Sequence, residues 1–180
     1  KFIAAAIAAS LCACTVGEDA GDQRAGASLS ADDTGDGSGF GMLARTCAAG
    51  ATTPGIDVSY YQGTIDWSRV AAGGYKFAFI RVSDGTTFHD PKFASYWTGS
   101  KNAGLIRGAY QFFRPAQDPI AQADYLLSMI GPHQDGDLPP VIDVENSGGL
   151  APADVEAAVR AWVDHVAAAI GRPPIVYAGY

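Results

Sequence analysis

An acidic pair at the end of an apolar run is the most chemically suggestive feature of this sequence. Val141 and Ile142 lead into Asp143, and Glu145 follows two positions later. Side chains two residues apart on a strand point to the same face, so the two carboxyl groups are expected to lie close together. On a partly buried face this proximity raises the pKa of one acid, which leaves a proton donor beside a charged group. The pair alone leaves a second interpretation open, in which Asp143 caps a loop or helix and Glu145 is solvent-exposed.

Alternating strand and helix patterns indicate how the chain positions this pair. Short apolar runs predict five strands, at residues 55–61, 76–83, 105–113, 138–145 and 173–180. Periodic segments between them, two of them opened by Asp-Pro and all closed by Gly, predict helices at 65–74, 90–104, 118–131 and 151–171. This alternation is typical of an α/β fold with a parallel sheet. No Gly-rich phosphate loop follows the first strand, which favours a barrel over a nucleotide-binding open sheet.

The carboxyl ends of parallel strands form the edge where α/β proteins place their active sites. The side chains expected there are acids, aromatic rings and amides: Asp57, Tyr60, Gln62, Asp84, Tyr110, Phe112, Asp143, Glu145 and Tyr177. Rings stack on the apolar faces of sugars, polar groups bind hydroxyls, and a carboxylic acid protonates a leaving oxygen. The set therefore predicts a carbohydrate site. No His stands at a strand end to complete a metal site, and we expect neither metal nor cofactor.

The composition and net charge limit the classes of partner that the protein is expected to bind. The chain has 180 residues, of which 48% are hydrophobic and 17% charged, and its net charge is -7. It carries neither the basic footprint of a nucleic-acid-binding protein nor a polybasic membrane patch. A neutral or weakly charged substrate suits such an acidic protein, and no nucleic acid is expected to bind.

The first 53 residues differ in composition from the rest. An apolar run at 2–11 is too short to span a bilayer and fits a signal peptide. Leu11-Cys12-Ala13-Cys14 resembles a bacterial lipoprotein cleavage box, with Cys14 as the lipidated residue and a membrane attachment through that lipid; a plain secretory signal is the alternative. Both predict export, either as a membrane-anchored lipoprotein or as a secreted protein. The predicted organisation is a signal peptide at 1–14, a flexible tether rich in Gly, Ala, Ser and Asp at 15–53, and a folded domain at 54–180.

Two features suggest that the natural chain is longer than this sequence. The first residue is Lys1 rather than Met, and Cys47 has no partner cysteine further along the chain. An odd thiol in an exported protein implies a partner elsewhere. We therefore expect that the natural chain extends beyond Tyr180.

Several other side chains are expected to have structural roles. Three tryptophans are interpreted as packing residues: Trp67, Trp97 and Trp162. Three aspartates are interpreted as helix caps: Asp66, Asp90 and Asp118. Arg81 is expected to pair with a carboxylate at the strand ends and to hold that acid ionised.

Five sequence strings, taken in order, resemble glycoside hydrolase family 25, the Chalaropsis-type lysozymes. They are GIDVSYYQGTIDW, KFAFIRVSDGTTFHDPKFASYW, AGLIRGAYQFF, PPVIDVE and PPIVYAGY, and they extend over residues 55–180. The resemblance implies an N-acetylmuramidase that hydrolyses the β-1,4 bond between N-acetylmuramic acid and N-acetylglucosamine in peptidoglycan. It also implies an irregular barrel of eight strands. Because five strands are predicted, we expect a TIM-like barrel that is truncated after the fifth strand.

Site roles follow from the resemblance, position by position. It implies that Glu145 is the general acid, Asp143 the second carboxylate of an Asp-x-Glu motif and Asp57 the acid of the first strand. Tyr110 matches an aromatic residue of the substrate groove. Family members commonly read Tyr-His-Phe in the third strand, and Gln111 replaces that histidine, so we expect an altered groove with activity retained. The implied mechanism retains configuration, with the substrate's N-acetyl oxygen as nucleophile; direct attack by Asp143 is the alternative.

Two other functions compete with hydrolysis of peptidoglycan. A non-catalytic module that binds the cell wall could use the same groove, but the intact acids argue against it. A chitinase-type glycosidase also ends a strand in Asp-x-Glu, yet that family has an Asp-rich run where this chain has Val141 and Ile142.

Overall fold

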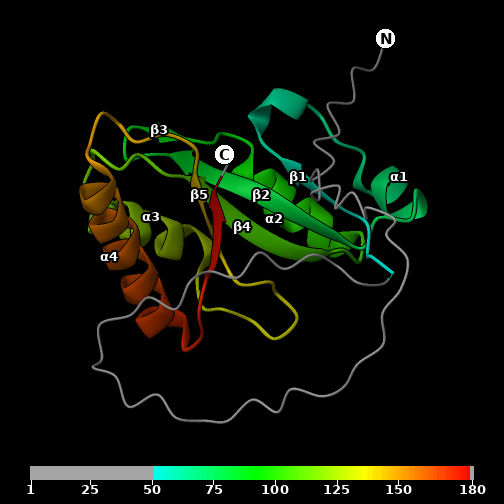
Figure 1. Ribbon diagram of the computed structural model, residues 1–180. Coiled ribbons are helices and arrows are strands. Elements are labelled where there is room, and N and C mark those ends of the chain that lie inside the picture. The colour runs from blue at the N-terminus through cyan, green and yellow to red at the C-terminus, as the bar shows by residue number, and fades with distance from the viewer. Residues whose placement is uncertain (1–50, 179–180) are drawn as a thin grey trace, which may run out of the picture. The chain divides into compact units, whose positions relative to one another are not determined.

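A parallel β-sheet forms the centre of the computed structural model, which describes residues 51–178 (Figure 1). Its strands are β1 (Gly55–Val58), β2 (Phe77–Asp84), β4 (Ile106–Phe112), β5 (Val141–Val144) and β6 (Ile175–Ala178). They are hydrogen-bonded in the order β1-β2-β4-β5-β6, and the two-residue β3 (Phe88–His89) pairs antiparallel with the end of β2. The five predicted parallel strands are therefore confirmed, whereas β3 was not predicted.

The helices connect successive parallel strands. They are α1 (Trp67–Ala72), α2 (Phe93–Asn102), α3 (Pro119–Ile130) and α4 (Pro152–Ile170), and a short 3-10 helix, η1 (Tyr60–Gln62), follows β1. All four predicted helices are present. The sheet is curled but stays open between β1 and β6 within residues 51–178, so the barrel prediction is confirmed only as a parallel α/β half-barrel.

One face of the sheet packs against the helices and forms the hydrophobic core. Ile80, Ala109 and Ile142 supply the strand side of this core, and Trp162 of α4 and Leu126 of α3 supply the helix side. All five side chains are at most 1% exposed. We call this side of the sheet the helix face.

The packing roles predicted for the three tryptophans are confirmed. Trp162 is fully buried, and Trp67 meets the ring of Tyr96 edge-on at a centroid distance of 5.5 Å. Trp97 stacks on Phe93 at 5.3 Å.

Two of the three predicted caps are confirmed, and one is wrong. Asp66 accepts a hydrogen bond from the backbone N–H of Arg69, and Asp118 accepts from the first turn of α3. Asp90 is not the cap of α2, because that position belongs to Lys92. The Asp90 carboxylate instead accepts hydrogen bonds from Arg81, from the backbone of Tyr60 and from the backbone of Lys92, so it joins three separate segments.

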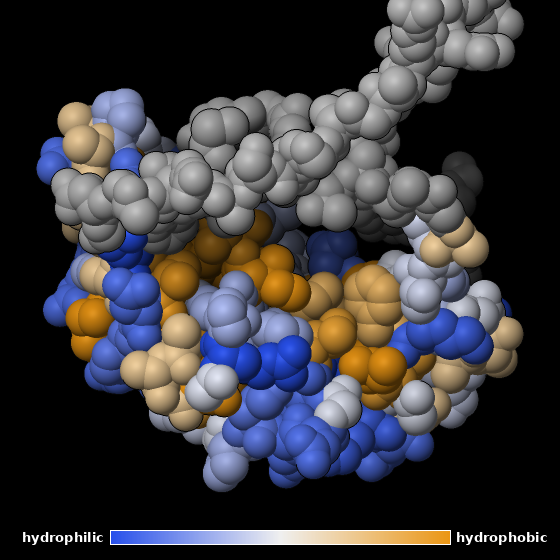
Figure 2. Space-filling model, turned by 60° about the horizontal axis from the view of Figure 1, so that its bottom comes forward, coloured by the Kyte–Doolittle hydropathy of each residue, from blue (hydrophilic) through white to orange (hydrophobic). Residues whose placement is uncertain are grey.

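The opposite side of the sheet is less completely covered than the helix face. Ile106 and Ile175, at the starts of β4 and β6, are 46% and 40% exposed. Figure 2 shows apolar residues gathered in a band across one side of the molecule, with hydrophilic residues bordering it.

The predictions for the signal peptide, Cys14, Cys47 and most of the tether lie outside the described residues. Among the helices that are described, none combines the length and the apolar character that crossing a membrane requires.

Candidate active site

Strand register determines which side chains share the face opposite the helices. In the register of the sheet, Arg81 of β2 lies opposite Tyr110 of β4. Further along the strands, Phe112 of β4 lies opposite Asp84 of β2 on one side and Asp143 of β5 on the other. Paired residues of neighbouring strands project to the same side, so these side chains lie together. We call this side the site face; its members are Asp57, Arg81, Asp84, Tyr110, Phe112, Asp143 and Tyr177.

A β-bulge places two charged residues of β2 on the site face. The register between β2 and β4 shifts between Arg81 and Ser83, so that Val82 is the extra residue. Without the shift, Arg81 and Asp84 would point to opposite faces, because they are three residues apart. The bulge therefore brings a cation and an acid to the same edge as Asp143.

Asp143 has the most perturbed environment of the predicted acids. Its Oδ1 atom is buried and has no hydrogen-bond partner among residues 51–178. Burial, reinforced by the negative charges of Glu145 and Asp57, raises the pKa of Asp143 to about 7, while Arg81 acts in the opposite direction. One acid of the Asp-x-Glu pair therefore has a raised pKa, as the spacing predicts.

Glu145 and Asp57 are the other two acidic residues predicted to be catalytic. Glu145 is the first residue after β5 and is exposed. Asp57 lies within β1, and partial burial raises its pKa. Asp143 does not cap α4, whose cap position is Ala151, so its interpretation as a helix cap is wrong, whereas the exposure of Glu145 expected in the same interpretation is observed. Nowhere in the described chain do three Asp, Glu, His or Cys side chains come close enough to hold a metal ion together.

Tyr110 lies among these charges. Burial is the main reason that the pKa of its phenol is raised, and Asp57, Asp143 and Asp90 raise it further against the opposing charge of Arg81. The ring therefore stays protonated and can donate a hydrogen bond across the neutral range. The prediction that Tyr110 accompanies the acids agrees with this position.

Asp84 and Phe112 share a partner on the loop after β4. The carboxylate of Asp84 accepts two hydrogen bonds from Arg114, at 2.5 and 2.7 Å. The Arg114 guanidinium also lies over the ring of Phe112, 4.7 Å from its centroid. On the other side of Asp143, Tyr177 of β6 is its register partner and is 47% exposed.

Tyr60 and Gln62 lie on η1 beside the site face. Tyr60 packs against the rings of Tyr61 and Phe88. The side-chain oxygen of Gln62 accepts a hydrogen bond from the backbone N–H of Ser59 at 2.7 Å, which completes a capping box. In this structure Gln62 thus holds the turn that carries Tyr60 and Tyr61.

Gln111 is not a groove residue, so the expectation that it alters the groove is wrong. It is fully buried on the helix face, where it accepts a hydrogen bond from Trp162 Nε1 at 2.7 Å. Its amide nitrogen donates to Ser83 Oγ and to the backbone oxygen of Gln122. The alternation of side chains along β4 could have revealed the position of Gln111, since the residue that follows Tyr110 in a strand must point away from the site face.

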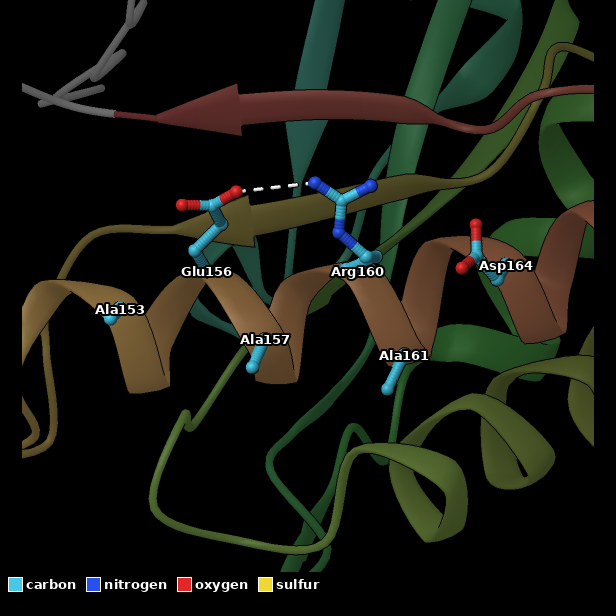
Figure 3. Close-up of a pocket in the computed structure, with 6 residues that line it drawn as sticks. All are labelled: Ala153, Glu156, Ala157, Arg160, Ala161 and Asp164. Atoms are coloured by element: carbon cyan, nitrogen blue, oxygen red, sulfur yellow. Dashed lines mark hydrogen bonds and ion pairs between the residues drawn. The ribbon is translucent and has the colours of Figure 1, made fainter. Parts of the chain in front are cut away.

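A shallow hollow elsewhere on the surface lies along α4 (Figure 3). Ala153, Ala157 and Ala161 are among its lining residues, and Glu156 accepts a hydrogen bond from Arg160 at 3.2 Å. All its lining residues come from α4, so it contains none of the predicted site residues.

Comparison with known proteins gives the same family as the resemblance of the five sequence strings. The model of glycosyl hydrolases family 25 matches residues 56–180. The chain belongs to this family. It is 40% identical over 135 residues to lysozyme M1 of Streptomyces globisporus, covering 71% of this chain and 46% of that protein. It is 33% identical to the N,O-diacetylmuramidase of Chalaropsis sp, covering 70% of this chain and 65% of that protein.

Solved structures of family 25 share the fold. The muramidase from Trichobolus zukalii superposes with a TM-score of 0.68 at 35% identity, covering 72% of this chain and 66% of that one. The chain spans about half the length of the first curated relatives that it matches.

Proposed function

We propose that the protein is an exported muramidase that hydrolyses the β-1,4 bond between N-acetylmuramic acid and N-acetylglucosamine in bacterial peptidoglycan. Membership of family 25 and the similarity to a lysozyme and a muramidase support the substrate class. The observation that carries the proposal is the environment of Asp143, whose pKa is raised to about 7 beside the exposed Glu145. Near neutral pH the raised pKa keeps part of the proton of this pair on Asp143, so the assignment of Glu145 as the acid that protonates the leaving oxygen rests on its exposure and on membership of family 25.

Exposure distinguishes the roles of the two acids. A polymeric substrate approaches from solvent, so the exposed Glu145 is the group that reaches the glycosidic oxygen and protonates it. Asp143 has a buried oxygen without a partner in the described chain. A buried acceptor of this kind gains most from a donor supplied by the substrate, and the N–H of an N-acetyl group is such a donor.

The reaction then proceeds in two steps. The N-acetyl carbonyl oxygen attacks the anomeric carbon while the bond to the leaving oxygen breaks and that oxygen takes the proton from Glu145. The Glu145 carboxylate next removes a proton from water, which opens the cyclic intermediate and restores the original configuration. Asp57 and Tyr110 support the developing charge. In the alternative, Asp143 itself attacks the anomeric carbon.

Groups around the acids hold the sugar chain. Tyr60, Phe112 and Tyr177 offer aromatic surface, and Asp84 and Gln62 offer polar atoms. Aromatic rings pack on the apolar faces of sugars, while carboxylate and amide groups bind hydroxyls. The ring of Tyr177 is 47% exposed and so is accessible to a ligand.

The cell envelope is the proposed location. A signal peptide at 1–14 exports the protein, either anchored through a lipid on Cys14 or secreted after cleavage nearby. Phase partitioning of the mature protein into detergent separates these two forms, because one acyl-modified cysteine adds strongly to its apolar character.

Glu145→Gln is the decisive variant. It keeps the shape of the side chain and removes the proton donor, so hydrolysis of peptidoglycan is expected to fall by about 10³-fold. Turbidity of a peptidoglycan suspension and release of reducing ends are the measurements. Glu156→Gln on the outer surface of α4 is the matched control and should retain wild-type activity.

Each competing function has its own outcome in this experiment. Undiminished hydrolysis by Glu145→Gln contradicts its role as general acid. Binding of peptidoglycan without hydrolysis by the wild-type protein would identify a non-catalytic wall-binding module. Faster hydrolysis of chitin than of peptidoglycan would identify a chitinase-like glycosidase.

A further inference from the structure

Arg81 is a buried cation on the site face. It is 8% exposed, and its register partner is Tyr110. Its Nε atom donates to Oδ2 of Asp90 at 3.1 Å. The Asp90 side chain is 1% exposed and also accepts from the backbone N–H groups of Tyr60 and Lys92, each at 3.0 Å. A buried ion pair with these extra hydrogen bonds fixes the orientation of the guanidinium.

Three aromatic rings enclose the same guanidinium. Its central carbon lies 5.3 Å from the ring centroid of Tyr60 and 5.4 Å from those of Tyr61 and Phe88. The rings also touch one another, with centroids 4.2 Å apart for Tyr60 and Tyr61. Cation–π attraction is strongest for a desolvated cation, so Arg81 holds these rings in place. Tyr61 is nevertheless 74% exposed and presents its free surface to solvent.

Arg81 also has a buried hydrogen-bond donor that is not used within the described residues. Its Nη2 atom is buried and lacks a hydrogen-bond partner among the described residues, as does Oδ1 of Asp143. A guanidinium whose only role was to neutralise Asp90 would be expected to satisfy its buried donors. The positive charge reaches further than Asp90, since it acts on both Asp143 and Tyr110.

We propose that Arg81 is a positioning residue of the site, which supplies the counter-charge for Asp143 and sets the rings of Tyr60, Tyr61 and Phe88 beside the acids. The catalytic part of this inference rests on the proposed muramidase function. Arg81 acts through Asp143 and through the rings, and it does not itself transfer a proton. Anchoring the cation to Asp90 keeps it beside the acids without pairing it directly to a catalytic carboxylate.

The surroundings of Asp143 define the test. Its charged and titratable neighbours come from β1, β2, β4 and β6 and from the residue after β5: Asp57, Arg81, Asp84, Tyr110, Tyr177 and Glu145. Arg81 is the only one of these that favours the ionised form of Asp143 by its charge. Removing that charge must therefore raise the pH at which Asp143 ionises.

Carboxyl NMR of the protein labelled with ¹³C at aspartate reads this ionisation directly, with or without enzymatic activity. Arg81→Met should move the titration midpoint of Asp143 upward by about 0.5 pH unit or more. Both limbs of the rate–pH profile on peptidoglycan should move in the same direction. Arg81→Lys keeps the charge, so both midpoints should stay near those of the wild-type protein, while KM rises about threefold or more because an ammonium cannot hold three rings as the guanidinium does.

A second variant protects the test against misfolding. Arg81→Met leaves Asp90 buried without its partner, which is costly, and Arg81→Met combined with Asp90→Asn removes both charges. The double variant should also shift the titration of Asp143 upward, but by less than Arg81→Met, because it removes the negative charge of Asp90 as well. An unchanged Asp143 titration in the folded double variant overturns the proposal, and so does a shift of equal size in Arg81→Lys. A wild-type protein that shows the expected titrations but never hydrolyses peptidoglycan contradicts the proposed function instead.

Discussion

The helix face and the site face are built from the same strands but differ in whether their buried polar groups have hydrogen-bond partners. On the helix face, the side chain of Gln111 is bonded to Trp162, Ser83 and Gln122. On the site face, Arg81 and Asp143 each keep one buried polar atom without a partner among residues 51–178. The residues that make this difference alternate along single strands, as Tyr110 and Gln111 do in β4.

The contrast separates stabilising chemistry from functional chemistry. A satisfied buried network adds stability and fixes one arrangement of the core. Unsatisfied groups and crowded acids cost stability, and they persist where a substrate is to supply the missing partner. Substitutions of Gln111 on the helix face and of Asp143 on the site face should therefore have opposite signatures, with stability lost at Gln111 and activity lost at Asp143.

Asp143→Asn should produce the largest effect of the substitutions compared across the two faces. The amide keeps the shape of the carboxylate and can still accept a hydrogen bond, but it has no negative charge with which to stabilise the reacting N-acetyl group. Activity should therefore fall by about 10²–10⁴-fold. The same change should stabilise the fold at alkaline pH. In the folded protein the pKa of Asp143 is about 7, above its ordinary value of 3.8, so its contribution to stability is complete below pH 3.8 and is lost as pH rises through about 7.

Thermal unfolding at two pH values measures the predicted stabilisation of Asp143→Asn. The neutral amide avoids burying a charge at pH 8, so the variant should gain about 1–3 kcal/mol over the wild-type protein there and much less at pH 4. Equal gains at both pH values would show that the charge of Asp143 is not the source of the strain. Retained activity would remove Asp143 from the mechanism.

Gln111→Leu should show the opposite pattern. Leucine fills a similar volume but leaves Trp162 Nε1 and Ser83 Oγ without a partner in the core, which should cost about 2–4 kcal/mol of unfolding free energy. Denaturant unfolding gives this value, and kcat and KM measured below the transition should stay near those of the wild-type protein. Gln134→Leu, on an exposed loop, is the matched control and should change stability by less than about 0.5 kcal/mol. A selective loss of kcat in Gln111→Leu would show that the two faces are not independent.

The sequence predicted what depends on local pattern and missed what depends on three-dimensional pairing. Alternating apolar runs and Asp-Pro and Gly boundaries were enough for the five parallel strands and four helices, because both signals act within a few residues. The role of Asp90 was missed since Asp90 follows β3 while its partner Arg81 lies within β2, and because Asp-Pro resembles a helix cap wherever it occurs. Gln111 was misplaced because a family comparison identifies a position without saying which face it occupies.

The ion pair between Asp84, on the site face, and Arg114, on the loop after β4, gives the smallest predicted effect. Their ion pair is partly solvent-exposed, at 26% and 40% of the side chains, whereas the backbone of Arg114 is held by the buried Gln122 through bonds of 3.0 and 3.1 Å. The loop should thus be anchored by Gln122, and Arg114→Gln should change the unfolding free energy by less than about 1 kcal/mol. KM for peptidoglycan should rise about two- to fivefold, because Asp84 and Phe112 lose the guanidinium that orients them. A loss of stability as large as that of Gln111→Leu would mean that the ion pair anchors the loop, and would place Arg114 with the structural residues of the helix face.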